Sequence, residues 1–278
     1  MKRFIGIVLL AGLVAGCGVK TAYNNLDRLV RWGVSDYVDL SRDQKQLLNQ
    51  EFATFHRWHR QNHLPLYADF AQELAIQSSD GISVARMTDI VNQVEFWAEE
   101  AEAQMNQVVV EVMQTLTDEQ VDELPEKLAD SNEELAEPEQ GLSVAEAQAL
   151  WAEEYADILK NFIGRLNKEQ MAYLQRRSAG YQPERVLWAA YRERWQAELI
   201  NLLRDRNNAE FPVRYAALVA QRKSFYGPEL TSVDRSNRQL NTETAAYVLS
   251  NLTPKQSEKF AAALTELATD FRELAAQS

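Results

Sequence analysis

The chain has 278 residues, 46% of them hydrophobic, and a formal net charge of −12. This apolar content excludes a disordered chain, and the length allows one large or two smaller domains with a real core. The negative charge argues against nucleic acid or an anionic lipid surface as the main ligand. Because Cys17 is the only cysteine, no internal disulfide can form and the fold must depend on packing.

The first residues have the layout of an export signal. Lys2 and Arg3 precede an apolar run over residues 4–13, which is too short for a membrane-spanning helix because such a helix needs roughly 20 residues. Small residues follow the run, as at a cleavage site. The sequence Leu-Val-Ala-Gly-Cys at positions 13–17 resembles the lipobox of bacterial lipoproteins. This resemblance implies that residues 1–16 are a signal peptide and that Cys17 becomes the acylated first residue.

Acylation of Cys17 implies both an anchor and a location. Two or more acyl chains bind a bilayer stably, so a lipidated cysteine carrying palmitate needs no spanning helix. Gly18 rather than aspartate follows the cysteine, which in lipoproteins of this kind implies transfer to the outer membrane. We expect a lipid-anchored protein of the outer membrane that faces the periplasm, with residues 17–25 as anchor and tether and residues 26–278 as a helical domain.

The mature chain is predicted to be helical throughout. Glycine and proline are sparse, and no run alternates apolar and polar residues over the length of a strand. Residues 83–115 carry an unbroken heptad seam, and residues 150–166, 188–202 and 260–274 carry similar apolar faces. Pro65 should kink or restart the helix that begins near Ser41. The sequence therefore predicts an all-α fold, an elongated bundle of long, mostly antiparallel helices.

A five-residue motif recurs four times, starting at Leu40, Leu116, Leu166 and Leu252. Its second residue can act as the N-cap of a helix, and its glutamine, three residues later, can complete a capping box; each cap is worth about 1 kcal/mol. The copies start 76, 50 and 86 residues apart, which argues against a regular solenoid. The predicted capping residues are Ser41, Gln44, Thr117, Gln120, Asn167, Gln170, Thr253 and Gln256.

This motif is similar to the L-T-x-x-Q motif of small helical periplasmic chaperones of the Spy and CpxP type, and the similarity implies a chaperone-like role. A second resemblance covers essentially the whole mature chain and is to an uncharacterised family of Gram-negative envelope lipoproteins, which has no established activity. It is carried by the residues around Trp32, by Trp58, His59 and Arg60, and by the Leu-Pro-Leu-Tyr-Ala run at 64–68.

Charge is unevenly distributed along the chain. Residues 61–157 contain 23 acidic and two basic residues, whereas residues 160–238 contain eight acidic and 15 basic residues. The densest acidic stretch, about residues 118–141, is predicted to be a frayed helix with an exposed loop and the most mobile part of the chain. It is either a solvated face that partly pairs with later arginines, or a docking surface for a basic partner or a divalent cation.

All three histidines lie close together, at His56, His59 and His63. This spacing places them on one face of a helix, where imidazoles can bind zinc or copper. Alternatively, they are polar-tipped residues at the edge of a core seam, because one helix rarely presents three ligands to a single ion. No H-E-x-x-H motif accompanies them.

Sequence motifs of the common enzymes are missing from the chain. It has no nucleophile elbow, P-loop or Rossmann glycine pattern, and an acylated Cys17 offers no free thiol. We expect a non-catalytic protein without a cofactor, a protein-binding or chaperone-like module that meets the membrane through its lipid, binds an envelope protein or client, and binds no nucleic acid. The alternative is a cell-wall or glycan hydrolase, or a metal-binding protein, that uses the histidine face.

Overall fold

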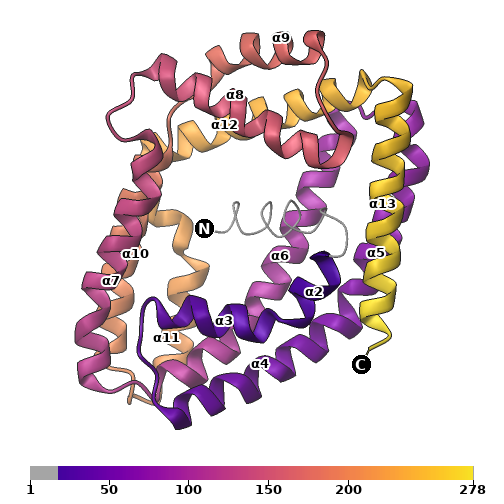
Figure 1. Cartoon of the computed structure of the whole chain (residues 1–278). Coiled ribbons are helices and arrows are strands. Elements are labelled where there is room, and N and C mark those ends of the chain that lie inside the picture. Colours follow the sequence, from indigo (N-terminus) through magenta and orange to yellow (C-terminus); the bar gives the residue numbers. More distant parts are fainter. Residues whose placement is uncertain (1–17, 278) are drawn as a thin grey trace.

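The computed structural model describes residues 18–277, and the regular structure of this part of the chain is helical (Figure 1). The expected all-α fold is confirmed. Cys17 and the expected signal peptide, residues 1–16, lie outside the described residues. The α-helices are α2 (Gly18–Asn24), α3 (Leu26–Ser35), α4 (Arg42–Asn62), α5 (Leu64–Gln77), α6 (Val84–Met113), α7 (Asp118–Ala136), α8 (Val144–Ile163), α9 (Lys168–Arg177), α10 (Arg185–Leu203), α11 (Phe211–Ala220), α12 (Gly227–Ser250) and α13 (Pro254–Ala275). Short 3₁₀ turns are η1 (Ser78–Asp80), η2 (Glu137–Glu139), η3 (Ser178–Gly180) and η4 (Arg222–Phe225).

Long helices pack as antiparallel pairs, of which α5 with α13, α7 with α10, and α4 with α6 make the most extensive contacts. In Figure 1 these pairs lie along the sides of a roughly four-sided arrangement, with α8, α9 and α12 along its upper side and α6 crossing toward α4. Each side buries its own apolar stripe because a helix with one apolar face must cover it with a neighbour. No helix within residues 18–277 is long and apolar enough to cross a membrane.

The core is divided into several clusters. The largest joins α4, α6, α7, α10 and α11 around the fully buried Leu203 and Phe211. A second joins α5, α6, α8, α9, α12 and α13 around Leu174 and Val248, and a third joins α2, α5 and α13. Fully burying one such side chain stabilises the fold by about 1.5–3 kcal/mol. These clusters position the capping motifs and the histidines described below.

Residues 18–24, where we expected a tether, form helix α2. Val19 and Tyr23, one helical turn apart, are only 3% and 6% exposed. They pack on α13 against Leu267, Phe271 and Leu274. The apolar pair anchors this short helix to the body because burial of those two side chains outweighs the weak helix propensity of seven residues. The chain is therefore docked onto α13 immediately after position 17.

The acidic stretch also differs from the expected frayed helix and exposed loop. Helix α7 runs through Pro125 to Ala136 and is followed directly by η2. Val121 and Leu124 are buried against the largest cluster, while Asn132 and Glu139 are buried polar residues. A few apolar residues three or four positions apart suffice to dock the helix, so its acids occupy the outward face.

Candidate functional site

Each of the four motifs begins a helix as a capping box. Ser41 Oγ accepts from the backbone N–H of Gln44, and Gln44 Oε1 accepts from the backbone N–H of Ser41 at 2.8 Å. The same exchange starts α7, α9 and α13. The residues eight positions after the motif leucines are buried. They are Leu48, Leu124, Leu174 and Phe260.

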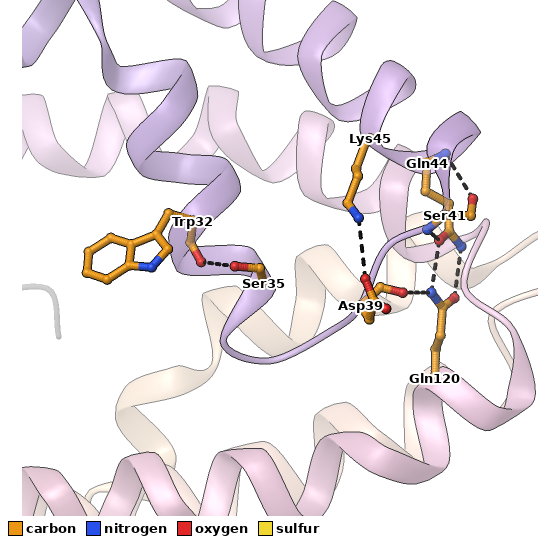
Figure 2. Close-up of polar contacts among 7 residues, drawn as sticks. All are labelled: Trp32, Ser35, Asp39, Ser41, Gln44, Lys45 and Gln120. Atoms are coloured by element: carbon orange, nitrogen blue, oxygen red, sulfur yellow. Dashed lines mark hydrogen bonds and ion pairs between the residues drawn. The ribbon is translucent and has the colours of Figure 1, made fainter.

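The first two motifs meet each other through their glutamines (Figure 2). Gln44 and Gln120 form a reciprocal amide pair in which each Nε2 donates to the other's Oε1 at 2.9 Å. The remaining hydrogen of each amide goes to a backbone carbonyl of the opposite motif: Gln44 donates to Thr115 O and Gln120 to Asp39 O, both at 2.7 Å. We call this arrangement the first junction; it joins the starts of α4 and α7.

The last two motifs repeat the arrangement as a second junction, which joins the starts of α9 and α13. Gln170 and Gln256 exchange amide hydrogen bonds at 3.1 and 2.9 Å. Gln170 also donates to Asn251 O, and Gln256 to Arg165 O. The accepting carbonyl at both junctions belongs to the residue just before a motif leucine, so the two sites share one geometry. The second junction is the more enclosed, with Gln170 only 2% exposed.

The chemistry of these junctions is structural. Each glutamine amide donates two hydrogen bonds and accepts at least two, which saturates its capacity. Neutral amides neither accept nor release protons near neutral pH. A cavity of about 410 Å³ lies beside the first junction, lined in part by Ser41, Asp43 and Leu47. Among the described residues that line it, Asp43 is the ionisable one.

The three histidines lie in a cluster with two tyrosines. The His59 Nδ1 is 2.9 Å from the Tyr23 hydroxyl, and its Nε2 is 3.4 Å from the Tyr67 hydroxyl. Tyr67 also pairs with His63 Nδ1 at 2.9 Å, and the His59 and His63 rings stack with centroids 5.2 Å apart. The His56 ring lies 4.5 Å from the ring of Tyr23. The histidine cluster therefore joins α2, α4 and α5.

Burial keeps the histidine cluster neutral. It lowers the pKa of His59 to about 3, with further lowering from His63 and His56, and it lowers the pKa values of the other two imidazoles. The hydroxyls of Tyr23 and Tyr67 occupy ring nitrogens that a metal would need. Within residues 18–277 no group of three or more His, Cys, Asp or Glu side chains is placed to hold a metal ion. The geometry thus gives the metal hypothesis no support.

Protonation of the histidine cluster should destabilise the fold. The unfolded chain binds a proton at His59 near pH 6.5 while the folded chain stays neutral until about pH 3, so stability is lost as the pH falls through this window. From pH 7 to pH 5 this residue alone should cost about 2 kcal/mol. Because glutamine does not titrate, the free energy of unfolding of His59→Gln, measured with urea, should fall less steeply between pH 7 and pH 5 than that of the wild-type protein. Parallel pH profiles for the two proteins would contradict the assignment.

Comparison with known proteins finds a family model that matches residues 36–231, described as a family of unknown function. The matched range contains the first junction and part of the second, together with most of the histidine cluster. No match is found among curated proteins or among solved structures.

Proposed function

The chain belongs to DUF6279, a family of unknown function, and we propose from its own residues that it is a lipid-anchored, non-catalytic protein of the bacterial envelope whose helical body binds another protein. The observation that carries this proposal is the Leu-Val-Ala-Gly-Cys sequence at 13–17, directly ahead of α2. Because α2 is packed on α13, acylation of Cys17 would place the body directly on the membrane. Gly18 after the cysteine supports the proposal that this is the outer membrane, with the body facing the periplasm.

Exposed apolar side chains support the protein-binding part of the proposal. Ile76 on α5, Phe96 on α6 and Val213 on α11 are 72%, 54% and 73% exposed. Large apolar side chains left in water on several helices are suited to contact the apolar segments of another protein. The saturated junctions and neutral histidines offer no competing catalytic arrangement among the described residues. We propose that these exposed side chains hold clients in a chaperone-like way or serve an assembly role.

The anchor is tested at Cys17. Cells expressing the wild-type chain should incorporate labelled palmitate into it and retain it in the outer-membrane fraction, because two or more acyl chains bind a bilayer stably. Cys17→Ser should abolish both the label and the membrane retention. Unchanged retention of the variant, or a wild-type chain that never takes up palmitate, would refute the proposed anchoring.

Client binding is tested with the soluble form that lacks Cys17. It should suppress the aggregation of an unfolding model protein, and Phe96→Ser should weaken the suppression while changing stability by no more than about 0.5 kcal/mol. Gln107→Ser is the matched control, because Gln107 is a polar residue exposed on the same helix. Failure of the wild-type chain to delay aggregation would count against a chaperone-like role.

A further inference from the structure

Helix α3 has an apolar face that the body covers only in part. Leu26, Val30 and Val34, spaced four residues apart, pack against the neighbouring core clusters. Leu29 and Trp32 continue the same apolar arc around the helix, but they are 47% and 69% exposed. No residue of α3 is fully buried. The uncovered part of the arc is therefore a continuous apolar strip rather than a single stray side chain.

Trp32 stands clear of its neighbours. In Figure 2 its indole ring projects away from the surrounding ribbons, while the hydroxyl of Ser35 donates to the backbone carbonyl of Trp32 at 2.6 Å. Tryptophan on an amphipathic helix is typical of the boundary between water and lipid, where the apolar ring is buried and its N–H can still find a polar partner. Leaving this ring in water costs apolar transfer energy that a bilayer interface would recover.

The position of α3 in the chain indicates that the exposed strip contacts the membrane. Helix α2 begins at Gly18, directly after Cys17, and only Asn25 separates it from α3. Fourteen positions separate Gly18, the first residue of α2, from Trp32, and at 1.5 Å per helical residue this places the ring within about 25 Å of the start of α2. Since Val19 and Tyr23 fix α2 to the body, there is no slack through which α3 could move away from the bilayer.

The local charge agrees with this placement. Residues 18–34 carry three basic side chains and one acidic side chain, in contrast to the acidic chain as a whole. Lys20 is paired with Asp270 and Glu273 of α13, so the basic character near the strip comes from the two arginines of α3. Arg28 is exposed beside the strip, and Arg31 pairs with Asp27 at 3.0 Å on the polar side. A helix with exposed Leu and Trp and with arginines flanking them is suited to lie in the plane of a membrane interface.

We propose that α3 is a second, interfacial membrane contact in which Leu29 and Trp32 insert at the boundary of headgroups and acyl chains beside the lipid anchor. This inference rests on the proposed acylation of Cys17. The contact fixes the orientation of the helical body on the membrane, because a lipid at one point and a helix face at another define a plane.

The test uses the acylated full-length protein in vesicles of phosphatidylethanolamine and phosphatidylglycerol. Because the chain has no cysteine besides Cys17, Trp32→Cys can be labelled at one place with an environment-sensitive maleimide dye. Val213→Cys on α11 is the matched control, since Val213 is 73% exposed. The Trp32→Cys label should show blue-shifted emission, quenching by nitroxide lipids and protection from iodide; the control label should show the reverse.

The outcomes separate this inference from the proposed function. If the wild-type protein purified from cells reacts with maleimide, its Cys17 thiol is free and therefore not acylated. That result overturns both the proposed anchor and this inference. A chain that floats with vesicles but whose Trp32→Cys label is quenched by iodide as strongly as the control keeps the anchor and overturns the inference. A label shielded from iodide yet untouched by nitroxide lipids also overturns it, because a protein contact then covers the strip.

Discussion

Replacing Gln170 by leucine should lower the free energy of unfolding by about 4 kcal/mol. The substitution removes both hydrogen bonds between the side-chain amides of Gln170 and Gln256. It also removes the donor to the Asn251 carbonyl and the acceptor for the backbone N–H of Asn167. Each buried polar group left unsatisfied costs about 1–3 kcal/mol. Urea unfolding followed by circular dichroism measures the loss.

A matched control separates the amide pair from the helix cap. Ser143 and Glu146 form a capping box at the start of α8, but Glu146 is exposed, and among residues 18–277 its carboxylate bonds Ser143 alone. Glu146→Ala should therefore cost much less than Gln170→Leu, because Ser143 still caps the helix and only the exposed bonds from the Glu146 carboxylate to Ser143 are lost. Gln170→Leu combined with Gln256→Leu should cost less than the sum of the single changes, because their partners are shared. Equal costs for Gln170→Leu and Glu146→Ala would show that the pairing adds nothing.

Most of the helical fold follows from the sequence. The heptad seam between Val84 and Val112 predicts α6, and the four motifs place the first residues of α4, α7, α9 and α13, because capping needs only residues three apart. Pro65 lies in the first turn of α5, where α4 has ended. These signals lie within a few residues of one another, so they can be recognised in the sequence without knowing which helices pack together.

Features that depend on distant partners were not predictable in this way. Helix α2 forms because Val19 and Tyr23 meet α13, whose residues lie some 250 positions later. The acidic α7 is held by buried contacts to α10, among them the amide pair of Asn132 and Gln196 at 2.6 Å. Neither contact can be recognised from the composition of the segment itself. Local hydropathy therefore does not predict that α2 and α7 form helices packed on the body.

In the candidate sites, too, the local features were predictable and the contacts between distant residues were not. The capping role of the motif glutamines is visible from spacing alone, but their pairing across helices is not. A signal for it exists: the copies at Leu40 and Leu116 are 76 residues apart and those at Leu166 and Leu252 are 86 apart, so the motifs fall into two similar pairs. The spacing of His56, His59 and His63 predicts a shared face, but not the tyrosine hydroxyls that occupy the ring nitrogens.

Replacing Arg206 by methionine should cost about 3 kcal/mol, the second largest effect we expect. Arg206 is 4% exposed and connects the loop after α10 to the first junction. Its Nε donates to Leu116 O at 2.6 Å and one terminal nitrogen donates to Leu203 O, while the other pairs with Asp118. Methionine keeps the apolar stem but removes the side-chain donor to Leu116 O and one of the two donors to Leu203 O, which still accepts from the backbone N–H of residue 206.

Arg214→Met is the matched control for this charge. Arg214 pairs with Asp205 at the surface, where its side chain is 45% exposed, and an exposed pair is worth about 0–1 kcal/mol. High salt should weaken that pair and leave the Arg206 contribution nearly unchanged, because buried contacts are screened much less. If both variants lose the same stability, or if salt removes the difference between them, Arg206 acts as an ordinary surface charge rather than as a buried donor that connects α10 to the start of α7.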